Sequence, residues 1–431
     1  MGDMDQTCRH LHTLAFDKQV WLALMGDLEA RLFLDRPPEQ HLRDLTTTEL
    51  INLAKRMVHG PRTWSHLSPS RFVSHQHVLH PMILIEPGCL YWRNEPKLLP
   101  GGKYVLFKNH NCRQELAVVC NFAAEMIING QAAVIIICQH IYVDHPNREN
   151  FVEIVHFDFL TETPLLLLCA FVPKTNYDNP YFHPRVHSDI AMVGIHMTTQ
   201  MLLINWKTES CIILSFSSTQ HNVALVCGYI ITSEPVPPSD ISRISVIDIQ
   251  SLAEYWMPID SMEHWKSVAI QDILPLTSDI IHGRCYHGPG FRLSAHESPL
   301  HEGLYVIWLF IPSRNMALPD PTFCSTICRY NLSCNPQGPG VPNQLHLKSS
   351  MRTDTCYNVD RDISYAGHTE IFDYVRNRTQ RVLSLPELHM IMNDNDGLVD
   401  LPDAGDHIHI SAYSGALTYA THDSVVINYY L

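Results

Sequence analysis

From about residue 82 onward, short apolar runs alternate with turn-forming residues over most of this 431-residue chain. The runs are rich in Val, Ile, Leu, Phe and Tyr, and the segments between them in Gly, Pro, Asn, Ser and Thr. Many short strands with close turn signals are typical of a sandwich, a barrel or a propeller. Helical patterns are nearly missing here, which argues against βαβ units. The clearest predicted strands are 104–108, 116–120, 132–138, 153–157, 190–196, 201–206, 211–216, 223–231, 244–249, 304–311 and 425–430.

Residues 190–216 form the clearest predicted supersecondary unit. Three strands are joined by the short connections 198–199 and 207–210, which predicts an antiparallel meander. The middle strand and its turn, residues 202–210, resemble a strand of a WD-type propeller blade. Asn205 stands where the Asp of that blade usually stands.

Strand ends of this kind recur along the chain as a large apolar residue, then Asp or Asn, then an apolar residue. They are found at Asp158, Asn205, Asp248, Asn331, Asp373 and Asn428, with a degenerate one at Cys120. The successive spacings are 38, 47, 43, 83, 42 and 55 residues, and WD-type blades repeat at about 40 to 45 residues. If the 83-residue step holds two periods, the repeat predicts a β-propeller-like domain of about seven blades, closed by the C-terminal strand. A sandwich or another multi-sheet fold is the alternative.

The first 60 residues carry helical periodicity instead. Asp17 is the expected N-cap of a helix that the proline pair at 37–38 ends, and Thr46 with Glu49 has the spacing of a capping box for a further helix ending at Gly60. The apolar stripes are Trp21, Leu24, Met25, Leu28 and Leu32 in one helix and Leu50, Leu53, Ala54 and Met57 in the next. We therefore expect a helical leader over 1–60, a linker over 61–80 and a β domain over 81–431.

The leader carries a resemblance to a known family. The stretch from Cys8 to Trp21, with Leu11, Leu14-Ala15 and Asp17, resembles the C-terminal half of an F-box, and the front half of the box is not present. The segments 99–102, 202–206, 363–367 and 413–419 and the end 425–430 are similar to F-box proteins of mushroom-forming (basidiomycete) fungi, so this likeness spans most of the chain.

The resemblance implies a substrate-receptor subunit of a cullin-type ubiquitin ligase. The truncated F-box would dock a Skp-type adaptor protein through Leu11, Leu14 and Trp21, or use these residues in its own core. The β domain would hold a protein substrate. One rival is a protein-interaction scaffold without the ligase link. The other is an enzyme with a site in the propeller channel, which a convergent cluster of His and carboxylates in that channel would favour.

The amino-acid composition limits the classes of binding partner and the cellular location that we expect. The net charge of -14 argues against a nucleic-acid or anionic-membrane surface. The 13 dispersed Cys and the lack of an apolar leader segment predict free thiols and a cytoplasmic or nuclear location.

No motif in the sequence predicts catalysis, a metal or a cofactor. The spacing of His296, Glu297 and His301 departs from the zinc-protease pattern, and Pro299 interrupts any helix there. Residues 393–397 resemble a calcium loop, but Met392 stands at its first ligand position and Asp403 replaces the bidentate Glu. The His407–His409 pair has no evident third ligand, and Cys324, Cys328 and Cys334 do not have zinc spacing. We therefore expect no catalytic residue, and a binding protein rather than an enzyme.

Overall fold

A computed structural model describes twenty stretches of the chain: residues 14–37, 39–65, 73–80, 96–107, 117–144, 147–172, 181–195, 198–219, 222–236, 241–260, 266–282, 292–315, 322–334, 343–353, 358–359, 362–372, 380–386, 399–400, 408–421 and 424–430. The described chain is mostly β and forms a β-propeller, with helices at its N-terminal side. This confirms the expected class and rules out the sandwich.

The leader contains two helices that pack on each other. α2 spans Lys18–Ala30 and α3 spans Thr47–His59, and the 3-10 turns η1 (Leu42–Asp44) and η2 (Arg62–Trp64) follow them in turn. Both predicted starts are confirmed, because the Asp17 side chain accepts from the Gln19 N–H and Thr46 forms a full capping box with Glu49. The buried face consists of Met25, Leu28, Phe33, Leu34, Leu42, Leu45, Leu50, Leu53 and Met57.

The predicted end of the first helix is wrong. α2 ends at Ala30 instead of at the proline pair, because Leu32 takes the left-handed conformation with φ of 65°. The Leu32 N–H then donates to the Glu29 carbonyl and the Phe33 N–H to the Leu28 carbonyl, which is the Schellman pattern. Phe33 and Leu28 share the helical core, so their packing offsets the unfavourable backbone angle of a non-Gly residue.

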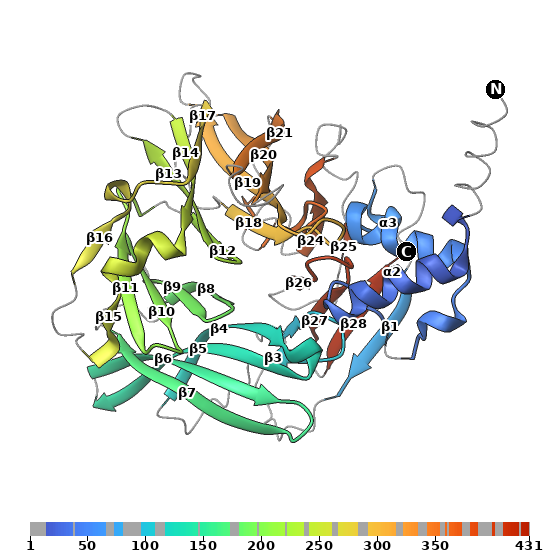
Figure 1. Ribbon diagram of the computed structural model, residues 1–431, viewed down its shortest axis with the longest axis horizontal. Coiled ribbons are helices and arrows are strands. Elements are labelled where there is room, and N and C mark those ends of the chain that lie inside the picture. The colour runs from blue at the N-terminus through green and yellow to red at the C-terminus, as the bar shows by residue number, and fades with distance from the viewer. Residues whose placement is uncertain are drawn as a thin grey trace.

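The described residues form six sheets of four or more strands that follow one another around a ring, and all but one of their described strand pairings are antiparallel (Figure 1). The first three sheets are β4 (Ala117–Ile127), β5 (Ala132–Asp144), β6 (Asn147–Asp158) and β7 (Thr163–Val172); β8 (Tyr181–His187), β9 (Ile190–Ile195), β10 (Gln200–Asn205) and β11 (Ser210–Ser215); and β12 (Asn222–Val226), β13 (Tyr229–Val236), β14 (Ile241–Asp248) and β17 (Thr277–His282). The next three are β18 (Arg292–Glu297), β19 (Leu304–Asn315), β20 (Thr322–Ser333) and β21 (Gln344–Thr353); β22 (Asn358–Val359), β23 (His368–Phe372), β24 (Gln380–Ser384) and β25 (Val399–Asp400); and β26 (Ile408–Ile410), β27 (Leu417–Ala420), β28 (Val425–Tyr430) and β1 (Val73–Leu79). A two-stranded ladder, β2 (Pro96–Leu98) and β3 (Val105–Phe107), shares apolar clusters with the last sheet and the first.

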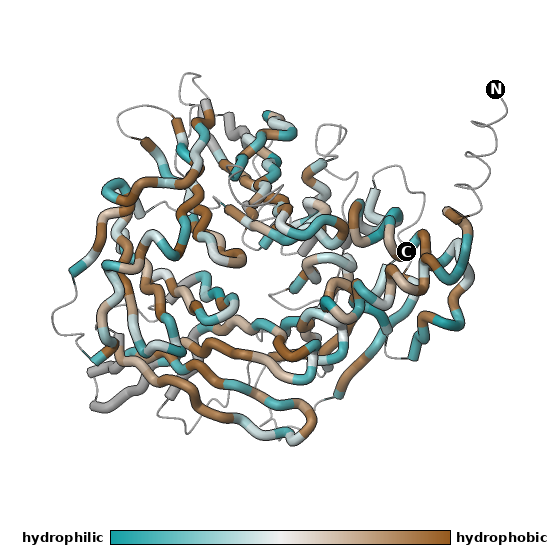
Figure 2. Tube along the Cα trace, in the orientation of Figure 1, coloured by the Kyte–Doolittle hydropathy of each residue, from teal (hydrophilic) through white to brown (hydrophobic). Residues whose placement is uncertain are grey.

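The core of the ring lies between neighbouring sheets. Each apolar cluster combines residues of two adjacent sheets, as Ile154 with Val193 and Ile231 with Ile307. Figure 2 shows apolar stretches along the strands of the ring. Burial of both faces of a blade explains why the strands read as nearly continuous apolar runs.

The predicted antiparallel meander over residues 190–216 is confirmed. β10 pairs with β9 on one side and with β11 on the other. The Asn205 side chain accepts from the N–H groups of Lys207 and Thr208, so its role at the strand end is to start the turn. Asp158 and Asp248 do the same at the ends of β6 and β14.

The predicted count of about seven blades is not borne out: five blades are detected among the six sheets of four or more strands that the described residues form. The described residues show why the 83-residue step was wrongly counted as two blades. Asp248 and Asn331 lie in β14 and β20, the third strands of adjacent sheets, so the 83-residue step covers one position of the ring. The extra length holds η5 (Ile249–Tyr255), β15 (Met257–Pro258), β16 (Ser267–Ala269) and η7 (Ile270–Asp272). β15 and β16 turn back and pair with β11 of the preceding sheet.

The ring is closed by both ends of the chain. β28 lies between β27 and β1, so the strand from the N-terminal side completes the sheet that the C-terminal strands build. β1 falls within the 61–80 stretch that we expected to be a linker. Pairing of β1 with β28 removes a free edge from β28, the strand that would otherwise end the sheet. None of the described helices has the length and apolar character needed to cross a membrane.

Candidate functional site

The residues predicted to face an adaptor lie at the start of the leader. Leu14 is 41% exposed, whereas Trp21 is partly buried against the helical core and donates its Nε1–H to the Ala15 carbonyl at 2.7 Å. The third, Leu11, lies outside the described residues. Phe16 and Val20 add exposed apolar side chains next to Leu14.

The leader is tied to the ring through the buried carboxyl of Asp35. Its Oδ1 accepts the Gly101 N–H at 2.8 Å, and its Oδ2 accepts the Ser414 hydroxyl at 3.0 Å. Burial raises the pKa of Asp35 above its ordinary value, against hydrogen bonds that favour the charged form. Two of the segments that carry the family likeness, 99–102 and 413–419, therefore meet at one leader residue.

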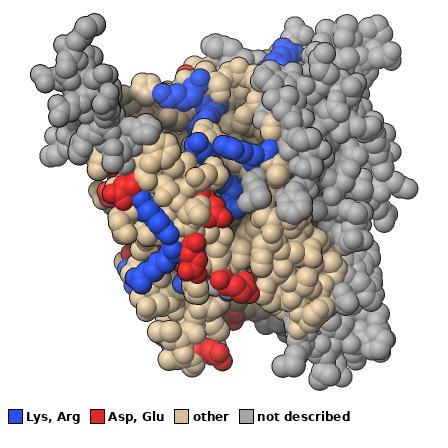
Figure 3. Space-filling model, turned by 90° about the vertical axis from the view of Figure 1, so that its right-hand side faces the viewer, with Lys and Arg blue, Asp and Glu red and all other residues tan. Residues whose placement is uncertain are grey.

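A groove separates the leader from the closing sheet. It has a volume of about 810 Å³ and is lined by Glu39, Asn52, Arg56, His59, His75 and Tyr429, among others. Figure 3 shows acidic and basic side chains side by side on the face that carries the leader. The groove therefore lacks a strong field of one sign.

One set of side chains at this groove has the chemistry of a metal site. His75 and His77 lie two residues apart on β1 and face Glu39 of the leader. His75 Nε2 lies 3.5 Å and His77 Nδ1 3.9 Å from the Glu39 carboxylate, and the three ligand atoms lie within 4.8 Å of one another. Tetrahedral Zn²⁺ needs ligand atoms about 3.3 Å apart, so small side-chain rotations would bring them into range.

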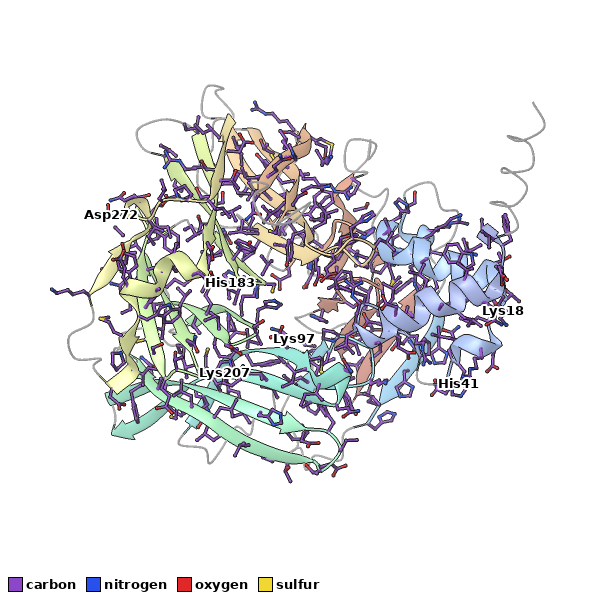
Figure 4. The ribbon with its side chains drawn as sticks, in the orientation of Figure 1. Lys18, His41, Lys97, His183, Lys207 and Asp272 are labelled. Carbon is purple, nitrogen blue, oxygen red and sulfur yellow. The ribbon has the colours of Figure 1, made fainter. Side chains whose placement is uncertain are left out.

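The middle of the ring carries a charged cluster. Arg185 of β8 forms an ion pair with Asp362, and Figure 4 shows His183 and Lys97 pointing toward the centre. Burial opposes the charge of Asp362, but Arg185, Lys97 and His183 outweigh it and hold the pKa of this carboxyl below its usual value. The space beside this cluster is only about 10 Å³, which is too small for an organic ligand.

A second cluster lies at the ends of innermost strands and borders a larger space. His187 at the end of β8 is paired with Glu125 of β4 at 2.8 Å and is hydrogen-bonded to Cys227, which follows β12. Cys227 lines a cavity of about 620 Å³. We call Glu125, His187 and Cys227 the thiol cluster.

Sequence reasoning missed all three residues of the thiol cluster. The prediction of one strand over 223–231 hid the turn at Cys227-Gly228, where Gly228 has φ of 75° and connects β12 to β13. The dipeptide Cys-Gly inside an apolar run was the available signal for that turn. Nothing in the sequence brings residue 125 to residue 187.

Among the described residues, the motifs that resemble metal sites in the sequence form no group of three ligands. His296 is partly buried and places its Nε2 2.5 Å from the Ile363 carbonyl oxygen. His409 accepts the Leu98 N–H at 3.3 Å. Cys328 is buried, Cys334 is partly exposed, and the 393–397 stretch and His407 lie outside the described residues.

Comparison with known proteins finds matches only at low sequence identity and low TM-score, among the solved structures given below. No family model and no curated protein sequence matches the chain. Among solved structures it is similar to the WD40 domain of SCAP from fission yeast, at 8% identity over 77% of this chain and 79% of that one, with a TM-score of 0.32.

Two further solved structures resemble the chain. One is the Penicillium chrysogenum alpha-L-arabinanase complexed with arabinobiose, at 10% identity over 84% of this chain and 98% of that one, with a TM-score of 0.29. The other is an oligogalacturonate lyase in complex with manganese, at 7% identity over 73% and 97%, with a TM-score of 0.23. The propeller seen in the structure is consistent with a protein-interaction scaffold.

Proposed function

We propose that this chain is a protein-binding receptor of the F-box type, in which the leader docks a Skp-type adaptor and the propeller binds a target protein. The leader would then join the target to a ubiquitin ligase and perform no chemistry itself. Its contribution would be proximity, because tethering raises the effective concentration of the target at the ligase.

The observation that carries the proposal is the exposed apolar start of the leader. Leu14, Phe16 and Val20 are 41%, 57% and 48% exposed within residues 14–20. Scattered single apolar side chains are ordinary on a protein surface, whereas several close together favour a contact with a partner. Val20 lies in α2, which buries Met25 and Leu28 in the helical core, so the exposed apolar group is additional to the face that the leader uses internally.

The test is capture of the adaptor by the purified full chain. We expect the triple variant L14S/F16S/V20S to lose at least about tenfold in affinity, since burying three half-exposed apolar side chains contributes more than the 1.4 kcal/mol that a tenfold change requires. A matched control replaces Leu160 and Leu274, which are 73% and 87% exposed on the propeller, by Ser. The control variant should bind as the unmodified chain does.

Two results would contradict the proposal. Equal capture by the leader variant and the control would remove the leader surface from adaptor binding. Failure of the folded, unmodified chain to capture the adaptor at all would leave a propeller scaffold without the ligase link as the better account.

A further inference from the structure

The thiol cluster is built by the ends of neighbouring innermost strands. Glu125 lies near the end of β4, His187 ends β8 and Cys227 directly follows β12. β8 lies against both β4 and β12. Strands that run side by side around a channel bring their ends to the same mouth, so residues distant in sequence meet there.

The carboxylate of Glu125 is fixed at both oxygens. Oε1 lies 2.8 Å from His187 Nδ1, and Oε2 accepts the Ser188 backbone N–H at 2.6 Å. Because Nδ1 faces Glu125, Nε2 is the ring nitrogen left for the hydrogen bond with Cys227. Cys227, His187 and Glu125 thus have the order of a nucleophile, a base and a group that orients the base.

Electrostatics in this arrangement favour the ion pair of a thiolate and an imidazolium. Burial opposes protonation of His187, but the hydrogen bonds to Cys227 and Glu125 outweigh it and raise the pKa of His187 to about 10. The hydrogen bond from His187 lowers the pKa of the Cys227 thiol, against burial and the nearby Glu297. The thiolate is the reactive form of cysteine.

The thiol is exposed beside a space large enough for a small organic ligand. Cys227 lies at the surface in the turn to β13 and lines the cavity of about 620 Å³. Asp248, Glu297 and Glu302 contribute carboxylates to this lining, and the described lining contains no Lys or Arg. A cavity with this charge disfavours anions and accepts neutral or cationic molecules.

We infer that Cys227, His187 and Glu125 form a nucleophilic thiol site that accepts an acyl group from a neutral or cationic ester held in the adjacent cavity. This activity goes beyond the proposed receptor function and does not depend on it. Cys227 is the nucleophile and His187 the general acid and base. Glu125 is a positioning residue, because it acts through His187.

The steps balance with water as the only co-reactant. The Cys227 thiolate attacks the ester carbonyl carbon, a carbon–sulfur bond forms, and the carbon–oxygen bond to the alcohol breaks. The His187 imidazolium gives its proton to the departing alkoxide. His187, now neutral, then takes a proton from water, whose oxygen attacks the thioester. The acid leaves and the thiolate and imidazolium are restored.

Alkylation of single cysteines tests the nucleophile. Cys169 is the internal control, because it is also exposed but lies beside Glu153 instead of a His, and burial raises its pKa. Each unit by which a thiol pKa falls increases thiolate tenfold and decreases its intrinsic reactivity about threefold, a net gain of about threefold. With iodoacetamide at pH 6.5, peptide mass spectrometry should show Cys227 reacting at least about threefold faster than Cys169.

Variants separate the roles of the cluster. H187Q should remove the advantage of Cys227 and move its pH profile of alkylation upward. E125Q should shift the profile in the same direction by less, since the ring stays in place but loses its orienting charge. A positively charged methanethiosulfonate should modify Cys227 about tenfold faster than a negatively charged one, after normalisation to Cys169.

Acyl transfer is measured with p-nitrophenyl acetate on the full chain. We expect an acetyl adduct on Cys227, its decay in buffer, and release of p-nitrophenol that C227A abolishes and C169A leaves unchanged. Equal alkylation of Cys227 and Cys169, or a Cys227 rate insensitive to H187Q in a variant with unchanged circular dichroism, would overturn the thiol site. Fast alkylation without any acetyl adduct would overturn acyl transfer.

Discussion

Replacing Asp35 tests how the leader is attached to the ring. The side chain is 3% exposed and accepts one hydrogen bond from Gly101 and one from Ser414. In D35A the Gly101 N–H is left buried without its acceptor, at a cost of about 1–3 kcal/mol, and the Ser414 hydroxyl keeps only its contacts with Ser411 and the Ala416 N–H. We expect D35A to lose about 2–4 kcal/mol of folding free energy, a large part of the roughly 5–15 kcal/mol that proteins have.

The matched variant is D35N. Its amide oxygen keeps an acceptor for Gly101 and it introduces no buried charge, so we expect a loss of about 1 kcal/mol or less. Because burial raises the pKa of Asp35 in the folded state, the stability that this carboxyl contributes falls as pH rises through that pKa. D35N lacks this titration. Its stability relative to the unmodified chain should therefore improve from pH 4 to pH 7.

The assay is urea denaturation at pH 4 and pH 7, followed by circular dichroism and Trp fluorescence. At pH 7 the urea midpoint of D35N should lie close to that of the unmodified chain, and the midpoint of D35A should lie well below both. Equal losses in D35N and D35A would refute the reasoning, because they would show that the negative charge, and not the acceptor, holds the leader.

Two further predictions concern the same region. Trp64 is 1% exposed, and its ring meets the Tyr430 ring edge-on with 5.3 Å between the ring centroids. W64A should therefore lose about 3–5 kcal/mol of folding free energy, measured from urea denaturation. A loss below about 1 kcal/mol would contradict this packing. Zn²⁺ should raise the thermal midpoint of the unmodified chain and of H59A, which changes the groove but not the metal ligands, and should leave the midpoint of H75A unchanged. A Zn²⁺ concentration 100-fold over Kd corresponds to a stabilisation of about 2.7 kcal/mol. An equal shift in H75A would exclude Glu39, His75 and His77 as the metal ligands.

The sequence by itself determined the local features of this protein. Apolar runs broken by turn residues are enough to predict strands, because the side chains of a run must be buried and the backbone must turn where Gly, Pro or Asn permits it. The helix caps at Asp17 and Thr46 and the meander of β9, β10 and β11 depend on contacts a few residues apart. Asp158, Asn205 and Asp248 start turns at the ends of their strands, so this part of the repeat could be predicted from local sequence.

The count of blades, the ring closure and the candidate sites were decided by the tertiary structure. β15 and β16 add to a sheet that precedes them, and β1 pairs with a strand at the other end of the chain. No local sequence pattern predicts such pairing, because the free energy of the pairing comes from contacts between segments far apart in sequence. Glu125, His187 and Cys227 meet for the same reason: packing of successive blades brings together the ends of their innermost strands, and only the folded ring sets that distance.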